Sequence, residues 1–180
     1  LHKGDLPEGL DLGPVVAVDT ETMGLRAVRD RLCVVQLSAG DGTAHLVQLA
    51  LGSYDAPRLK ALLADPAVLK IFHFARFDVA MIRHYLGVDC APIYCTKIAS
   101  RLCRTYTDRH GLKELVREIL GQEISKQQQS SDWGGAVLSE AQRDYAASDV
   151  RYLHALREEL DRRLAREGRM AECGALQFGG

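Results

Sequence analysis

Long apolar runs are missing from this sequence. No stretch approaches the roughly 18 consecutive apolar residues that a membrane-spanning helix needs. The first ten residues, LHKGDLPEGL, do not show the basic segment followed by an apolar one that marks a secretion signal. We therefore expect a protein that has no membrane partner and resides in the cytoplasm.

Paired cysteines and excess charge are also missing. The five cysteines are an odd number without a Cys-x-x-Cys spacing, so we expect neither a disulfide framework nor a zinc site. A formal net charge of −1 excludes a protein that coats long nucleic acids through bulk electrostatics. Residues 97–117 are locally basic, with six Lys or Arg against two acids, which is typical of a solvated helix face or of a local nucleic-acid contact.

The composition that remains is that of one globular domain. The chain has 180 residues, of which 47% are hydrophobic and 26% charged, enough for a sizeable core. Hydrophobic periodicity and turn residues predict strands over 15–19, 32–38, 44–49 and 68–72, and helices over 57–63, 75–86, 95–103, 112–120 and 139–164. We expect residues 1–14 to be irregular, 88–93 to be extended, 122–137 to form an ordered loop and 168–180 to hang loose or contact another subunit. The pattern predicts an α/β fold, in which three antiparallel strands are followed by alternating strands and helices in a mixed sheet.

Two carboxylates stand at the end of the first predicted strand. Asp19 and Glu21 are two residues apart, so strand periodicity points both side chains to the same side. Adjacent acids repel each other unless a cation lies between them, and hard oxygen ligands suit Mg²⁺ or Mn²⁺. A strand that simply runs into a polar loop gives the same pattern, so metal binding requires further ligands.

Two other acids also stand at the edges of apolar elements. Asp78 lies near the start of a predicted helix, where an acid can also serve the helix dipole. Asp149 follows Tyr145 by four residues, so both side chains lie on one helix face. A buried unpaired carboxylate is costly, and a metal ion would be a suitable partner for Asp149.

The segments that carry these acids resemble a known set of motifs. DTETMG, HFARFD and YAASD resemble the three exonuclease motifs of the DEDD superfamily, in the subgroup whose fourth acid is preceded by a tyrosine. From about Val15 to Leu160, the order and approximate spacing are similar to the ribonuclease D branch. The segments FHFARFD, CTKIASRL, RTYTDRHGLKE and ISKQQQSSDW are most similar to nano-RNase C, a family of small ribonuclease D relatives in alphaproteobacteria.

The resemblance implies an RNase H-like fold and a metal-dependent 3′-5′ exoribonuclease. Its substrates would be very short RNAs, chiefly dinucleotides, and its products nucleoside 5′-monophosphates. It implies two divalent cations, Mg²⁺ or Mn²⁺, with Asp19 bridging both. Glu21 and Asp149 would complete the site of the attacking water, Asp78 would serve the second ion, and Tyr145 would orient the water.

The resemblance also bears on domain organisation and assembly. Residues 1–180 would form a single exonuclease domain with a core of about 15–167, without the C-terminal helical (HRDC-type) RNA-binding domains of ribonuclease D. The protein would be a homo-oligomer, an octamer as in nano-RNase C. Gly134, Gly135 and Ala136 stand where an arginine-proline pair usually follows the tryptophan. Both departures argue against long structured RNA.

Candidate substrate contacts are less tightly defined by the motifs. Leu25 suits a wedge against the terminal base or a plain core position, His73 a base or sugar contact or a structural role, and Trp133 base stacking or anchoring of the loop. Side chains that suit other substrate contacts, among them the phosphate, are Thr20, Arg109, His110, Lys126, Gln129, Ser130 and Ser131. Two rival functions stay open: a general exonuclease on longer single-stranded RNA or DNA, and a non-catalytic RNA-binding scaffold.

Overall fold

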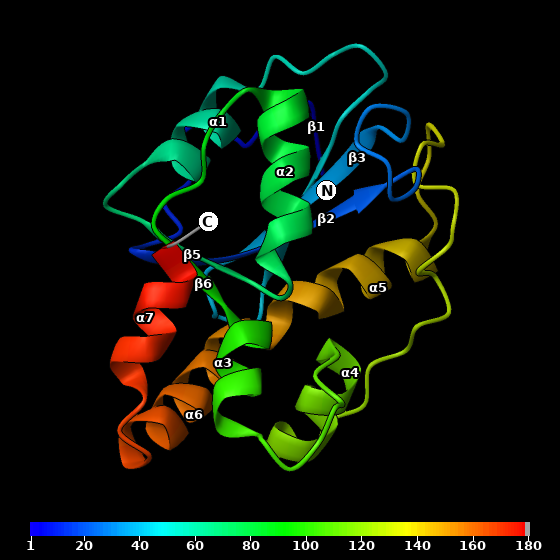
Figure 1. The fold of residues 1–180 in the computed structure, drawn as a ribbon. Coiled ribbons are helices and arrows are strands. Elements are labelled where there is room, and N and C mark those ends of the chain that lie inside the picture. The colour runs from blue at the N-terminus through cyan, green and yellow to red at the C-terminus, as the bar shows by residue number, and fades with distance from the viewer. Residues whose placement is uncertain (179–180) are drawn as a thin grey trace.

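The centre of the fold is a six-stranded mixed sheet (Figure 1) with the strand order β1-β4-β3-β2-β5-β6. The computed structural model describes residues 1–178, apart from the side chains of residues 175, 176 and 178. The strands are β1 (His2–Lys3), β2 (Val15–Thr22), β3 (Leu32–Ser38), β4 (Ala44–Gln48), β5 (Leu69–Phe72) and β6 (Ile93–Cys95). β2, β3 and β4 are antiparallel neighbours, whereas β5 runs parallel to β2 and β6 parallel to β5. The predicted mixed α/β sheet is therefore confirmed.

Helices cover both faces of this sheet (Figure 1). The helices are α1 (Pro57–Ala64), α2 (Ala75–Leu86), α3 (Thr96–Cys103), α4 (Leu112–Leu115), the π-helix η1 (Val116–Leu120), α5 (Glu140–Arg151), α6 (Leu153–Arg166) and α7 (Met170–Phe178). Helices α1 and α2 pack on one face, and α5 and α6 pack on the other. Among the described residues, no helix is long and apolar enough to cross a membrane.

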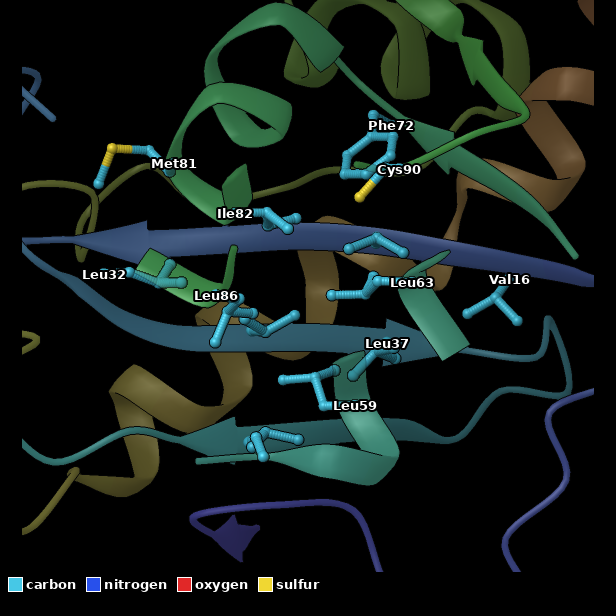
Figure 2. Close-up of a cluster of buried hydrophobic side chains, with 14 of the residues drawn as sticks. Val16, Leu32, Leu37, Leu59, Leu63, Phe72, Met81, Ile82, Leu86 and Cys90 are labelled. Carbon is cyan, nitrogen blue, oxygen red and sulfur yellow. The ribbon is translucent and has the colours of Figure 1, made fainter. Parts of the chain in front are cut away.

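The alternation of side chains along β2 divides the core between the two faces. Val16 belongs to the cluster that includes Leu59 of α1 and Ile82 of α2 (Figure 2). Val18 belongs to the same cluster. Ala17 belongs to the opposite cluster, which α6 and η1 complete. Successive residues of β2 therefore face different helices, as the period of two requires.

Most predicted elements form close to their expected bounds. The hairpin β3–β4, helix α1 beginning at Pro57 and helix α2 are confirmed. Gly87 ends α2 with a φ of 68°, a left-handed conformation that glycine adopts without a Cβ penalty. Ser139 and Gln142 form the predicted capping box at the start of α5.

The prediction of a single helix over 139–164 is wrong. The chain bends at Tyr152, which has φ −105° and ψ −4° and separates α5 from α6. Helix α5 packs on β2, β3 and β4, whereas α6 packs on α3 and η1. The apolar period continues across the bend because both helices bury a face against the same side of the sheet, so the period alone does not reveal it.

The prediction of a loose tail over 168–180 is also wrong for its described part. Helix α7 packs against α3, α6 and β6, and the Gln177 amide pairs with the backbone of Cys95, accepting a hydrogen bond from its N–H and donating one to its C=O at 3.2 Å. A polar side chain therefore anchors the helix, and no apolar period marks it in the sequence. Leu176 and Phe178 are the apolar residues of this tail that would suit a contact with another subunit, and their side chains lie outside the described residues.

Smaller differences concern three other segments. The N-terminal stretch, expected to be irregular, contributes β1, which pairs with β4. The extended piece expected over 88–93 is a strand only from Ile93. The helix expected over 112–120 is α-helical to Leu115 and continues as η1 until Gly121 ends it with a φ of 65°.

Candidate active site

The carboxyl end of β2 distributes polar side chains to both faces of the sheet. Asp19 and Glu21 continue the face of Ala17, toward α5, while Thr20 continues the face of Val18, toward α2. The Thr20 hydroxyl donates a hydrogen bond to Oδ1 of Asp78, which lies in the first turn of α2. Alternation within one strand thus connects it to acids on two different helices.

A cluster of three acids forms where β2 meets α5. Carboxylate oxygens of Asp19, Glu21 and Asp149 all lie within 4.8 Å of one another. Gln36, directly opposite Asp19 on β3, donates hydrogen bonds to Glu21 Oε1 at 3.0 Å and to Asp19 Oδ2 at 3.5 Å. The structure therefore brings together acids that are 130 residues apart in the chain.

Burial raises the pKa of all four acids, and the charges of neighbouring acids raise it further for Asp19, Glu21 and Asp78. Burial and the Asp149 carboxyl raise the pKa of Glu21 to about 9. Burial raises the pKa of Asp78 to about 7 and that of Asp149 to about 6. The pKa of Asp19 lies well above its ordinary value because of burial and of the charges of Asp78, Asp149 and Glu21. Each of these acids is therefore harder to ionise than it would be in water.

These donors fit a divalent cation. Across the described residues 1–178, none of the four acids forms an ion pair with a Lys or Arg side chain. The ligand set is entirely oxygen, which suits Mg²⁺ or Mn²⁺ rather than a thiolate-bound metal. Acids that repel each other in isolation are stabilised together when a dication neutralises them.

Tyr145 stands beside the acid cluster. It precedes Asp149 by one turn of α5, and its pKa is raised by burial and then by the charges of Asp149, Glu21 and Asp19. Its ring packs against the indole of Trp133, with ring centroids 5.9 Å apart. The phenol is therefore held in its protonated form, as a hydrogen-bond donor rather than as a base.

A cleft of about 580 Å³ opens over these side chains. Its walls include all four acids and Tyr145, together with six of the ten candidate substrate contacts: Thr20, Leu25, His73, Gln129, Ser130 and Ser131. Arg109, His110, Lys126 and Trp133 do not line it. The structure therefore separates the candidate contacts into two groups.

Trp133 is not placed to stack on a base. Its side chain is 1% exposed and packs with Cys33, Val34 and Leu138. The indole is the anchor of the loop before α5, which is the other role that the sequence left open. The physical reason is size, because one large apolar ring is enough to fix a polar loop to the sheet.

The other three residues outside the cleft have different surroundings. Arg109 and Lys126 are exposed. His110 is buried, with its Nδ1 2.7 Å from the Ser100 hydroxyl and 3.4 Å from Arg104 Nη1. Burial and then the Arg104 charge lower the pKa of His110, so this ring is a neutral structural group.

His73 lines the cleft in a fixed orientation. Its Nδ1 lies 2.8 Å from the Thr96 hydroxyl. Burial and then the charge of Lys97 lower its pKa to about 3. The imidazole is therefore neutral and already hydrogen-bonded, which supports the structural role considered for it.

Leu25 is 84% exposed and is not a core residue. Asp30 folds the loop that presents it, accepting a hydrogen bond from the Arg26 N–H at 3.0 Å. A Cβ at Gly24 would lie 2.3 Å from Asp30 Oδ2, so this tight turn requires glycine. The loop holds an apolar side chain in the open cleft, the position that a wedge needs.

Several residues of the site are not predicted from the sequence. Gln36 had a usable signal, since it is the one amide in the largely apolar strand LCVVQLS, and the structure pairs it in register with Asp19. Met23, Phe74 and Phe77 also line the cleft. All three are apolar, and an apolar side chain at the end of an element gives no sign of whether it faces a core or a cleft.

Comparisons with known proteins agree with this geometry. The sequence profile of a 3′-5′ exonuclease family matches residues 5–165. A ribonuclease D of Granulibacter bethesdensis is 40% identical over 158 residues, which cover 88% of this chain and 40% of that protein. The chain thus spans about two fifths of the length of the curated relatives it matches.

Solved structures give a fuller match. Brucella melitensis NrnC bound to pGG is 54% identical, with a TM-score of 0.95 over 98% of this chain and 86% of that one. Brucella melitensis NrnC with bound Mg²⁺ is 53% identical, with a TM-score of 0.94 and the same coverage. Escherichia coli RNase D is 30% identical, with a TM-score of 0.76 over 92% of this chain and 44% of that one. The chain belongs to the 3′-5′ exonuclease family, among the ribonuclease D-like nucleases that include Brucella melitensis NrnC.

Proposed function

We propose that this protein is a 3′-5′ exoribonuclease that hydrolyses very short RNA, chiefly dinucleotides, to nucleoside 5′-monophosphates. The observation that carries the proposal is the cluster of Asp19, Glu21 and Asp149 in an open cleft, with carboxylate oxygens within 4.8 Å of one another and Tyr145 one helical turn away. This arrangement concentrates negative charge where a phosphodiester, itself an anion, has to react. Such a site is productive only with cations, so the proposal includes two divalent ions, Mg²⁺ or Mn²⁺.

The four acids are the ligands that we assign to these two ions. We assign Asp19, Glu21 and Asp149 to one ion, and Asp78, together with Asp19, to the second. Bound divalent ions supply positive charge to the phosphoryl oxygens and acidify the attacking water. Gln36 and Thr20 orient the carboxylates through their hydrogen bonds to Glu21 and Asp78, the kind of support that metal ligands usually have.

Tyr145 positions the attacking water by donating a hydrogen bond. Its raised pKa keeps the proton on the phenol at neutral pH, so it is not the general base. Its place one turn before Asp149 brings the hydroxyl to the same side of α5 as the carboxylate. The indole of Trp133 supports the ring from the side of the loop.

Two observations support a short substrate. The cleft volume of about 580 Å³ falls within the range of roughly 300–1,000 Å³ for sites that enclose one small ligand. A nuclease 54% identical to this chain has been solved with pGG, a short nucleotide. Leu25, Gln129, Ser130 and Ser131 line the cleft and are assigned to substrate, with Leu25 as a wedge against the terminal base.

A length series tests the substrate. RNAs of two to seven nucleotides labelled at the 5′ end are incubated with the enzyme and Mg²⁺, and initial rates are compared at equal concentrations. The expected result is much faster loss of the dinucleotide than of the heptamer, and no activity in Asp149→Asn. Equal rates for two and seven nucleotides would indicate a general exonuclease, and a deoxyribose series in parallel would show whether DNA is accepted.

The proposal extends to organisation and assembly. We propose that residues 1–180 form a single exonuclease domain, with a core of about 15–167, in a cytoplasmic homo-oligomer, an octamer. These points depend on the resemblance to the nano-RNase C family. Light scattering at micromolar concentration tests the assembly, and a monomer there would contradict it.

A further inference from the structure

The wall of the cleft contains an aromatic side chain in an unusual backbone conformation. Phe74 precedes α2 with φ 66° and ψ 56°, and it is the single non-glycine residue with positive φ in the described chain. A bulky residue in this left-handed region is strained, and such strain persists where the surroundings enforce it. Glycine would occupy the position without this cost and asparagine at a lower cost, so stability alone does not explain a phenylalanine here.

The ring of Phe74 is presented to the cleft rather than to the core. The residue is 47% exposed and lines the cleft together with Leu25, Met23 and His73. The ammonium nitrogen of Lys97, from the first turn of α3, lies 4.2 Å from the centre of the ring. Lys97 covers one face of the Phe74 ring, so the exposed area of this side chain lies on the remainder of the ring.

The surrounding backbone holds the residue in place. The C=O of Phe74 accepts a hydrogen bond from the N–H of Phe77 at 3.3 Å, and the N–H of Ala75 donates to Cys95 Sγ at 3.5 Å. The adjacent His73 ring is bound to Thr96. The backbone at Phe74 is therefore held in place before any ligand binds, and Lys97 packs against the ring that it presents, which lowers the entropy cost of binding a flat partner.

We propose that Phe74, backed by Lys97, is a stacking platform for one base of the RNA substrate and a determinant of its affinity. A nucleobase is a flat ring with two π-faces, and stacking on an aromatic side chain is tolerant of base identity. Lys97 acts through the ring, by fixing it from the opposite face through a cation–π contact. The proposal rests on the proposed function, because it concerns how that same cleft holds its substrate.

The first test compares Phe74→Ala, Phe74→Tyr and the control Leu51→Ala, an exposed apolar residue that does not line the cleft. Substrates are an intact dinucleotide and two analogues that each lack one base. Phe74→Ala is expected to raise KM for the intact dinucleotide about tenfold, in line with the loss of one base–aromatic stack, with a smaller change in kcat. Phe74→Tyr and Leu51→Ala are expected to keep the KM of the unaltered enzyme.

The analogues decide whether a base is involved. If a base stacks on Phe74, the KM ratio between Phe74→Ala and the unaltered enzyme falls to near one for the analogue that lacks that base. An equal ratio for all three substrates overturns the proposal. If the unaltered enzyme cleaves none of the dinucleotides, the proposed function itself fails, whereas normal cleavage with an unaffected Phe74→Ala overturns the platform alone.

Two further variants separate the ring from its surroundings. Phe74→Asn, which suits the left-handed backbone, is expected to melt at a higher temperature than Phe74→Ala while showing the same tenfold rise in KM, so that a folding defect does not account for the loss. Lys97→Met is expected to raise KM about threefold in the unaltered background and to have no effect in Phe74→Ala. A full Lys97→Met effect in Phe74→Ala overturns the assignment of Lys97 to the ring.

Discussion

Replacing Asp149 with asparagine is expected to stabilise the metal-free protein while abolishing its response to Mg²⁺. The pKa of Asp149 rises from its ordinary value of 3.8 to about 6 because of burial. At 1.36 kcal/mol for each tenfold change in the ionisation constant, ionised Asp149 lowers the free energy of unfolding by about 3 kcal/mol at neutral pH. Asparagine keeps the shape without the charge, so we expect Asp149→Asn to gain on the order of 2–3 kcal/mol in EDTA at pH 7.5.

The pH dependence of the unaltered protein follows from the same shifts. Glu21 and Asp149 bind protons more tightly in the folded state, with pKa values of about 9 and about 6. Between about pH 4 and pH 9 the folded state therefore retains protons that the unfolded state has released, and the free energy of unfolding in EDTA falls as the pH rises. The unaltered protein is expected to be more stable at pH 5.5 than at pH 8.5.

Urea denaturation followed by circular dichroism measures these differences, in EDTA and in MgCl₂. Mg²⁺ at 100 times its dissociation constant stabilises a protein with one site by about 2.7 kcal/mol. We expect this gain in the unaltered protein and its loss in Asp149→Asn. The control is Asp144→Asn, an exposed acid on the same helix, which is expected to match the unaltered protein within about 0.5 kcal/mol. Destabilisation of Asp149→Asn in EDTA, or full Mg²⁺ stabilisation of that variant, would refute the reasoning.

Three other variants give sharp expectations. Tyr145→Phe removes a protonated hydrogen-bond donor but no base, so kcat is expected to fall roughly tenfold to a hundredfold while the shape of the pH–rate profile stays the same. Loss of one limb of that profile would contradict this, because it would show that Tyr145 titrates during catalysis. Gln36→Leu removes the amide bound to Glu21, and we expect the Mg²⁺ concentration for half-maximal activity to rise about tenfold or more; an unchanged Mg²⁺ titration would contradict this role. Trp133→Ala empties a fully buried site and is expected to lower the free energy of unfolding by about 3–5 kcal/mol, whereas a change below about 1 kcal/mol would show that the loop does not depend on this anchor.

The sequence predicted elements whose signals are local. Alternating or continuous apolar runs located β2 to β5, and Pro57, Gly87 and the Ser139–Gln142 pair located helix ends, because each acts through its own backbone conformation or hydrogen bonds. The bend at Tyr152 was missed because neither glycine nor proline marks it. Helix α7 was missed because a long-range pairing between the Gln177 amide and the Cys95 backbone fixes it.

The candidate site likewise combines features that local spacing predicts with features that depend on contacts between distant segments. Spacing alone predicted that Asp19 and Glu21 share one side of a strand and that Tyr145 and Asp149 share one helix face. The meeting of these pairs depends on which helix covers which face, and only the resemblance to a known family suggested it. The burial of His110 was not predictable, because it depends on the buried Arg104, whose ion pair with Glu118 spans 14 residues.

The register of β2 connects fold and chemistry. Val16, Val18 and Thr20 face α2, whereas Ala17, Asp19 and Glu21 face α5. A slip of one residue would exchange the two sets, placing the acids against the apolar face of α2 and removing both the Thr20–Asp78 bond and the contact with Asp149. The apolar residues at the start of the strand hold that register, because their burial on both faces opposes any slip. The hydrophobic half of β2 therefore sets the positions of the carboxylates in its other half, and the geometry of the acid cluster is fixed by core packing before a metal ion binds.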